Sequence, residues 1–173
     1  MIHYIGKTSY QNVDFQTDST TFELVEYFRN HTSIQLDLET QGLNPRKGDI
    51  ITIQLGDRER QYVIELTDRE ICPLVRSLLH RNDDVCFIGH NLKFDAKWLL
   101  TYGIELNLVW DTMLAERVIH TGDHFGKSFG LKDVLYRRMN LIMDKAMQSS
   151  FIDHEGDLSA EQIQYAAFDV KYL

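Results

Sequence analysis

The stretch Ser33–Thr40, S-I-Q-L-D-L-E-T, carries two acidic residues inside an alternating pattern. Apolar and polar residues alternate, which predicts a β-strand with one buried face. Asp37 and Glu39 are two positions apart, so their side chains leave the strand on the same side. Two carboxylates in one half-buried place repel each other unless a proton or a hard divalent cation lies between them. The stretch therefore predicts part of a metal site, while a lone D-x-E on a solvated strand edge is the plainer alternative.

The composition is that of one folded domain. The chain has 173 residues, 43% hydrophobic and 25% charged, with two prolines, ten glycines and no low-complexity run. These fractions suit a single domain with a sizeable core. No apolar run approaches the roughly 20 residues of a membrane helix, and the N-terminus lacks a signal-peptide pattern. We interpret Cys72 and Cys86 as reduced buried thiols, which predicts a cytoplasmic, intracellular protein without membrane attachment.

The net charge of −8 restricts how the chain could bind a nucleic acid. It argues against a broad basic face that follows a duplex. It is compatible with a protein that grips a few nucleotides through bound metal ions, because acidic residues then gather where the metals bind.

Hydrophobic periodicity predicts a mixed α/β fold. After a short strand or arm at 3–6, we expect strands at 33–40, 49–55, 61–66, 85–88 and 106–110. The turn at 56–60 predicts an antiparallel hairpin, and the later strand–helix–strand order predicts parallel neighbours. The result is a mixed sheet of about five strands flanked by helices, which we expect at 68–80, 91–102, 113–120, 131–139 and 159–173, with a polar loop at 121–129.

Two helices carry start signals in the sequence. Ser19 or Thr20 can cap a first helix together with Glu23, and Ser159 can cap the last one with Gln162 in the capping-box position. We expect the first helix to bury Phe22, Val25 and Phe28, and the helix at 68–80 to bury Ile71, Leu74, Val75, Leu78 and Leu79.

A second acidic position lies in H-N-L-K-F-D, residues 90–95. Asn91 and Asp95 are four apart and would share one face of a helix. Phe94, Trp98 and Tyr102 follow on the same stripe. An ordinary amphipathic helix with an Asn cap explains most of this pattern, but a carboxylate among aromatic residues needs a partner.

A third position lies in Y-A-A-F-D, residues 165–169. Tyr165 and Asp169 are four apart, roughly a right angle from the centre of the apolar face of their helix. They should border the core where a cleft would be, although a Tyr–Asp pair at a helix boundary is also common. Ala166 and Ala167 allow the helix to approach its neighbours closely.

Together these three segments resemble the exonuclease motifs of the DEDD superfamily. The Y-x-x-x-D form is similar to its tyrosine branch, which includes the proofreading domains of family A DNA polymerases, ribonuclease D and the Werner-type exonucleases. W-D-T-M-L-A from Trp110 and G-L-K-D-V-L from Gly130 add to the resemblance, which covers roughly 33–173. The resemblance implies a ribonuclease H-like mixed sheet, in agreement with the strands expected above.

The resemblance also implies roles for the acidic residues. Two divalent metal ions, Mg²⁺ or Mn²⁺, would be held about 4 Å apart. Asp37 would contact both ions, Glu39 and Asp169 the ion that activates water, and Asp95 the other ion through water. Tyr165 would orient the attacking water. The reaction would release nucleoside 5′-monophosphates from a 3′ end.

The loop after the acidic strand is expected to hold the substrate. In similar enzymes Leu43 would wedge against the terminal base, and the backbone at Thr40 and Gln41 would meet the last sugar. Asn91 and Phe94 would line the same groove, Phe94 as a stacking surface. A Leu43 side chain folded onto the core is the alternative.

The resemblance implies a monomeric exonuclease acting on single-stranded or frayed DNA 3′ ends, as in proofreading. Ribonuclease D-like trimming of RNA and a catalytically silent nucleic-acid-binding domain remain alternatives, since no motif reports on the 2′-hydroxyl. Cysteine- or zinc-based sites are disfavoured because no ligand spacing links Cys72, Cys86, His120 and His124. The chain ends four residues after Asp169, so we expect an excised part of a longer protein, with a polymerase domain linked or separate.

Overall fold

The acidic strand β2 (Ser33–Thr40) lies inside a six-stranded sheet with the order β1-β4-β3-β2-β5-β6. The computed structural model describes residues 1–81, 84–122, 128–143, 147–152 and 154–173. The other strands are β1 (Ile2–Ile5), β3 (Ile50–Gly56), β4 (Gln61–Glu65), β5 (Cys86–Gly89) and β6 (Val109–Asp111).

The strand pairing confirms the predicted mixed sheet. β2, β3 and β4 form an antiparallel meander, and β5 and β6 add to β2 in parallel. One strand more than expected is present, because the N-terminal segment pairs in parallel with β4 from Ile2 to Ile5. The fold is therefore the expected α/β class, with the N-terminal arm as its sixth strand.

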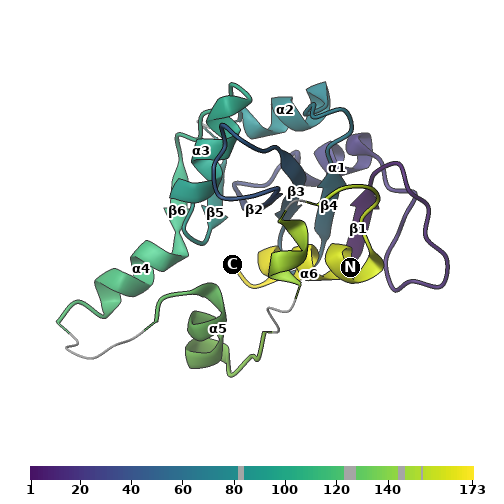
Figure 1. Ribbon diagram of the computed structural model, residues 1–173. Coiled ribbons are helices and arrows are strands. Elements are labelled where there is room, and N and C mark those ends of the chain that lie inside the picture. Colours follow the sequence, from purple (N-terminus) through teal and green to yellow (C-terminus); the bar gives the residue numbers. More distant parts are fainter. Residues whose placement is uncertain (82–83, 123–127, 144–146, 153) are drawn as a thin grey trace.

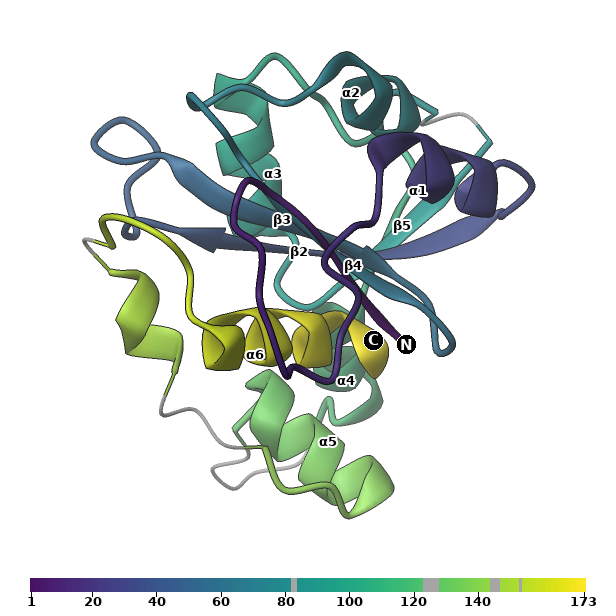
Figure 2. The same ribbon diagram turned by 90° about the vertical axis from the view of Figure 1, so that its right-hand side faces the viewer.

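Helices cover both faces of the sheet (Figure 2). α1 (Thr21–Phe28), α2 (Pro73–Leu79) and α3 (Lys93–Thr101) lie on one face, and α6 (Ala160–Lys171) lies across the other. α4 (Thr112–Ile119) and α5 (Leu131–Met139) extend from the edge strand β6 on the α6 side (Figure 1). A short 3₁₀ helix, η1 (Gln148–Phe151), precedes α6. Within the described ranges, none of the helices is long and apolar enough to span a membrane.

Each face of the sheet has its own apolar core. Ile34, Leu36 and Leu38 of β2 are buried toward α1, α2 and α3. On the other face, Ile163, Ala166 and Ala167 of α6 pack with residues of β1 and β4. Both faces of the sheet are therefore buried by helices. The polar side chains near the end of β2 lie at the border of this core.

Several predicted boundaries and faces are corrected. α1 buries Leu24 with Phe28, while Phe22 is 62% exposed. α2 begins only at Pro73, because Asp68 and Arg69 take left-handed backbone angles that a helix cannot contain. The buried residues of α2 are Val75, Leu78 and Leu79, and Leu74 is largely exposed.

The acidic helix α3 and the strand β6 also start later than expected. Asn91 has φ of 63°, so α3 begins at Lys93 and Asn91 lies in the turn before it. β6 begins at Val109. The predicted cap of α1 by Thr20 and Glu23, the cap of α6 by Ser159 and Gln162 and the bounds of α5 are confirmed. Part of the predicted loop at 121–129, namely 123–127 with His124, lies outside the described residues.

Candidate active site

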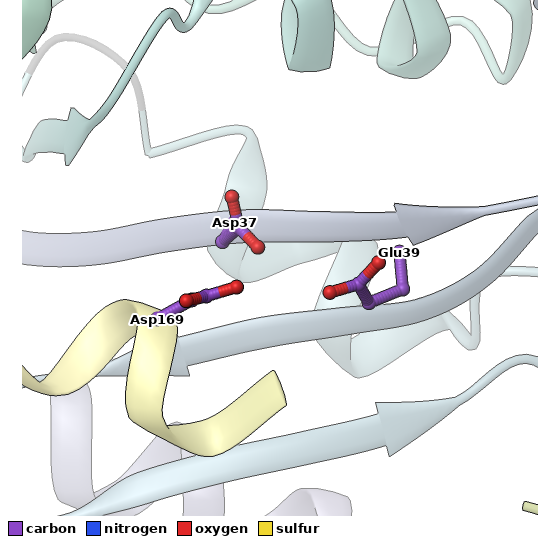
Figure 3. Close-up of side chains that lie close together, drawn as sticks. All are labelled: Asp37, Glu39 and Asp169. Carbon is purple, nitrogen blue, oxygen red and sulfur yellow. The ribbon is translucent and has the colours of Figure 1, made fainter. Parts of the chain in front are cut away.

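Three of the predicted acidic residues converge. One carboxylate oxygen from each of Asp37, Glu39 and Asp169 lies within 4.8 Å of the other two. Figure 3 shows Asp169 on α6 turned toward the strand that carries Asp37 and Glu39. β2 and α6 are far apart in the sequence, so their packing across the sheet face builds the cluster.

Local features of β2 and α6 place these side chains. The pairing of β2 with β3 shifts register between Glu39 and Thr40, which is a β-bulge beside the acidic residues. Both residues are buried, at 8% and 7% exposure, so the strict alternation of β2 ends there. In α6, Ala166 and Ala167 are 1% exposed, and these small side chains let the helix bring Asp169 close to β2.

Asp95 lies next to this cluster in the first turn of α3. It is 3% exposed and lines the same cleft as Asp37, Glu39 and Asp169. Among the described residues it is not part of the tight three-carboxylate group. Its contact with a metal through water stays a prediction.

The cluster is electrostatically unfavourable without a cation. Burial raises the pKa of Asp37 to about 7. Burial, and then the charges of Asp37 and Asp169, raise the pKa of Glu39 well above its ordinary range. Burial and Asp37 raise the pKa of Asp95 in the same way. A bound divalent cation would reverse these effects, because it favours the ionised carboxylates.

Tyr165 borders the cleft one helical turn before Asp169. Its ring packs near Phe151, with 6.3 Å between the ring centroids. Burial and the neighbouring charges of Asp169 and Glu39 raise the pKa of its hydroxyl. Tyr165 therefore keeps its proton and can donate a hydrogen bond at the edge of the carboxylate cluster.

A cleft of about 570 Å³ opens onto the carboxylates. Four of the predicted substrate-binding residues line it: Thr40, Leu43, Asn91 and Phe94. Leu43 is 84% exposed, so the alternative in which it folds onto the core is wrong. Gln41 does not line the cleft; its backbone N–H donates to the Asp49 carbonyl at 3.0 Å and its side-chain amide to the His154 carbonyl at 3.2 Å.

Sequence reasoning gave no role to Asp111, which fixes the first turn of α4 and the turn before α3. Its Oδ1 accepts the backbone N–H groups of Asn91 (3.0 Å), Met113 (2.9 Å) and Leu114 (3.2 Å). Its Oδ2 accepts the N–H of Leu92 at 2.9 Å. One carboxylate thus caps α4 and holds the turn before α3. An Asp preceding an amphipathic helix is the N-cap signal that could have revealed this role.

His90 connects the same turn to the segment before α5. Its Nδ1 lies 2.9 Å from Thr112 Oγ1, and its Nε2 lies 2.8 Å from the Phe129 carbonyl oxygen. Thr112 Oγ1 in turn lies 3.0 Å from the Gly89 carbonyl. His90 lines the cleft, so this chain of contacts fixes its ring in the cleft wall.

The donor set suits a hard divalent cation. Within the part of the chain that the structure describes, Asp37, Glu39 and Asp169 form the group of His, Cys, Asp or Glu side chains placed to hold a metal ion. All three supply oxygen, which Mg²⁺ and Mn²⁺ prefer over the sulfur and nitrogen ligands of a zinc site. Cys72 and Cys86 are free thiols outside this group.

Comparison with known families identifies the class. Residues 12–173 match the family described as 3′-5′ exonuclease of DNA polymerase A type. The chain belongs to this 3′-5′ exonuclease family, within the DEDD superfamily. It is therefore a metal-dependent 3′-5′ exonuclease domain.

One sequence relative and two solved structures are similar to the chain. DNA polymerase I of Aquifex aeolicus (strain VF5) is 33% identical over 150 residues, which are 86% of this chain and 24% of that protein. The chain thus spans about a quarter of that relative. Brucella melitensis NrnC superposes with a TM-score of 0.77 at 24% identity, covering 99% and 75% of the two chains. Escherichia coli RNase D, an exoribonuclease involved in structured RNA processing, superposes at 0.74 with 23% identity, covering 95% and 42%.

The two superpositions establish the shared fold. NrnC has also been solved with bound Mg²⁺, at a TM-score of 0.74 and 22% identity. A divalent cation in a protein of this fold agrees with the oxygen-rich cluster of the present chain. The identity of the substrate does not follow from the fold, because a sequence relative is a DNA polymerase and a protein of the same fold is an exoribonuclease.

Proposed function

We propose that this domain removes nucleotides from the 3′ ends of single-stranded or frayed DNA, as a proofreading exonuclease does. The observation that carries the proposal is the convergence of Asp37, Glu39 and Asp169 within 4.8 Å at the wall of an open cleft. The sequence relationship to a DNA polymerase supports DNA as the substrate.

We assign the four acidic residues Asp37, Glu39, Asp95 and Asp169 to two metal ions. Two ions, when bound, neutralise the scissile phosphate, make water more nucleophilic and stabilise the leaving 3′ oxygen. The charge of Asp37 raises the pKa of both Glu39 and Asp95, which supports a place for Asp37 near both residues. In the proposed site Asp37 would contact both ions, Glu39 and Asp169 would hold one of them, and Asp95 would act on the second through water.

Tyr165 positions the attacking water. Its hydroxyl is protonated and lies beside the carboxylates, so it can donate a hydrogen bond to an oxygen nucleophile. The hydrolysis breaks the bond between phosphorus and the 3′ oxygen of the penultimate nucleotide. The products are a nucleoside 5′-monophosphate and a strand shortened by one unit.

The cleft selects a chain end. Leu43 is exposed at the cleft rim and can separate the last base from its neighbour, while Phe94 offers a stacking surface. The backbone of Thr40 and the side chain of Asn91 lie where the terminal sugar would be held; Gln41 acts by fixing the loop. A paired blunt end must first unstack, so frayed ends are preferred.

We also propose that the domain acts as a monomeric unit beside a polymerase. The relative from Aquifex aeolicus is a DNA polymerase of which the matched part is 24%. A proofreading domain needs such a neighbour, since the polymerase supplies the mispaired 3′ end.

A digestion with matched oligonucleotides tests this proposal. DNA and RNA strands of equal sequence, each labelled at the 5′ end, are incubated with Mg²⁺ or with excess EDTA. We expect a ladder of shortened DNA products, release of 5′-monophosphates and no reaction in EDTA. Preference for RNA would assign a ribonuclease D-like activity instead.

Two further results would contradict exonuclease action. Cleavage of a circular single strand would indicate an endonuclease. Binding of the strand without any release of mononucleotides would indicate a silent binding domain.

A further inference from the structure

Four exposed basic residues lie on two elements that also line the cleft, the β2–β3 loop and α3, and a fifth precedes α2, although the chain as a whole carries a charge of −8. We call this surface the basic track; it comprises Arg46, Lys47, Arg69, Lys93 and Lys97, and all five residues are exposed. The first two lie in the loop between β2 and β3, the third precedes α2, and the last two lie on α3.

The track begins on the outer face of α3. Lys93, Lys97 and Thr101 are spaced by four residues, so they form one stripe along the helix. Asp95 is the acidic residue of α3 and is buried on a different face, which leaves the stripe positive. The stripe starts beside Asn91 and Phe94 of the cleft and runs toward the C-terminal end of α3.

A second hollow lies at that end of α3. It has a volume of about 590 Å³ and is lined by the segment 45–49 together with Arg69, Thr101 and Tyr102. Arg69 lies 3.1 Å from Asp49, so this acidic group is neutralised. Within the described ranges, Arg46, Lys47, Lys93 and Lys97 make no ion pair with an acidic side chain.

The loop that presents Arg46 and Lys47 is held in a defined turn. The backbone N–H of Lys47 donates to the Asn44 carbonyl at 2.9 Å, and that of Arg46 donates to Asn44 Oδ1 at 3.0 Å. These contacts close a turn whose tip carries both cations. The backbone that carries the two cations is therefore fixed.

The hollow and the cleft are joined by the same loop and helix. The loop lines the cleft with Gly42 and Leu43 and lines the hollow with residues 45–49. A side chain at Gly48 would lie 3.4 Å from Trp98 of α3, so the loop packs directly on the helix. Figure 2 shows the β2–β3 loop and α3 on the same side of the molecule.

We propose that the basic track binds the phosphates of the substrate strand upstream of its 3′ end; this rests on the proposed function. The distance from Lys93 to Thr101 along α3 is about 12 Å, at about 1.5 Å per residue. At the roughly 3.4 Å per nucleotide of a duplex strand, this length corresponds to about three to four nucleotides, and an extended single strand covers it with fewer. Sequence-independent phosphate contacts there would favour long single strands over dinucleotides.

Two charge reversals in loops at opposite ends of β3 test the track. Lys47→Glu changes the track, and Arg58→Glu makes the same change of charge in the exposed turn after β3. Steady-state hydrolysis is measured with deoxythymidine oligonucleotides of two and of eight residues. Binding of the octamer in Ca²⁺ is measured between low and moderate salt.

The track predicts an effect that depends on substrate length. The parent should show a KM for the octamer about tenfold below that for the dinucleotide. Lys47→Glu should raise the octamer KM about three- to tenfold with unchanged kcat, and leave the dinucleotide KM unaltered. The salt dependence of log Kd should become shallower by about 0.7 per lost phosphate contact. Arg58→Glu should match the parent.

The outcomes separate this inference from the proposed function. Equal KM values for the two lengths, or equal effects of the two variants, would overturn the track while leaving the exonuclease assignment intact. A parent protein that hydrolyses neither oligonucleotide would overturn the proposed function itself.

Discussion

The cleft has two walls that are held by different kinds of contact. The first, which we call the core wall, consists of β2 and α6 and rests on the apolar cores of both sheet faces. The second, the tethered wall, consists of α4 and α5 and supplies Met113 and Leu131 to the cleft. The buried residue of α4 is the carboxylate Glu116.

Polar contacts to that carboxylate join α4 to α5, and α5 also buries Val134 and Leu135. Glu116 accepts a hydrogen bond from Arg138 Nε at 2.5 Å and from Arg137 Nη2 at 3.2 Å, and His120 Nε2 lies 3.4 Å away. The apolar side chains of α4 point outward, with Leu114 53% and Val118 73% exposed. The carboxylates of Asp37, Glu39 and Asp169 thus lie on the core wall, whereas α4 is joined to α5 by polar contacts.

Removing a carboxylate from the core wall should have the largest effect. Asp37→Asn loses a metal ligand worth several kcal/mol, so hydrolysis should fall by at least about a thousandfold. The fold should persist and melt about 2–4 °C higher in EDTA, because one repulsive charge is gone. Mononucleotide release and thermal unfolding measure the two effects, with the exposed Asp14→Asn as control. A large fall in melting temperature would show that Asp37 is structural.

Tyr165→Phe tests whether the Tyr165 hydroxyl contributes to hydrolysis. The ring and its packing near Phe151 are kept, and only a hydroxyl is lost. One preorganised hydrogen bond is worth on the order of 3 kcal/mol at most, so cleavage should slow by about ten- to a thousandfold. DNA binding measured in Ca²⁺ should match the parent. An unchanged rate would reduce Tyr165 to a packing residue.

Glu116→Gln should loosen the tethered wall without touching the metal ligands. Loss of the charged acceptor should cost about 1–2 kcal/mol, less than a fully buried pair because Arg138 is half exposed. We expect a KM up to about tenfold higher and a nearly unchanged kcat. Denaturant unfolding and hydrogen exchange in α4 measure the change. Glu26→Gln, in an exposed pair with Arg29, is the matched control and should change stability little.

The two walls should respond to pH in opposite directions when no metal is present. Burial raises the pKa of Asp37 to about 7 from 3.8, so the folded state holds a proton that the unfolded state has lost. Stability from this wall therefore falls as the pH rises from about 4 to 7. Solvent in the open cleft limits the loss to about 1–2 kcal/mol.

Glu116 behaves in the reverse sense. Burial alone would raise its pKa, but hydrogen bonds from Arg138 and Arg137 outweigh burial and lower it. The Glu116 carboxylate therefore stabilises the folded state above its ordinary, unfolded-state pKa. This stability is lost as the pH falls through the lowered pKa of the folded state. Unfolding in EDTA from pH 3 to 8 checks both effects: Asp37→Asn should flatten the upper part of the profile and Glu116→Gln the lower part.

The sequence was sufficient for elements whose pattern is local. The alternation of β2, the capping boxes of α1 and α6 and the full extent of α5 follow from residues within one element. The convergence of β2 and α6 was predictable only through the family resemblance, because no local rule brings residues 37 and 169 together.

The elements whose bounds or buried faces were predicted wrongly depend on residues distant in the sequence. Asn91 was expected within a helix, but the Asp111 carboxylate holds the Asn91 turn with φ of 63°. The N-terminal arm was ambiguous because a four-residue segment becomes a strand only when β4 offers its edge. Helical spacing also placed Phe22 in the core, although the neighbouring Leu24 is the residue that is buried.

Asp111 accepts hydrogen bonds from four backbone N–H groups, and these link the start of α4 to the turn before α3. A rotation of α4 about its first turn would pull on the same carboxylate that fixes the turn before α3, and α3 carries Asp95 two positions after its first residue. A displacement of α4 would therefore act, through the Asp111 carboxylate, on the turn that precedes the helix of the buried Asp95. Substitutions at Asp111 and in the first turn of α3 should consequently be non-additive in a double-mutant cycle.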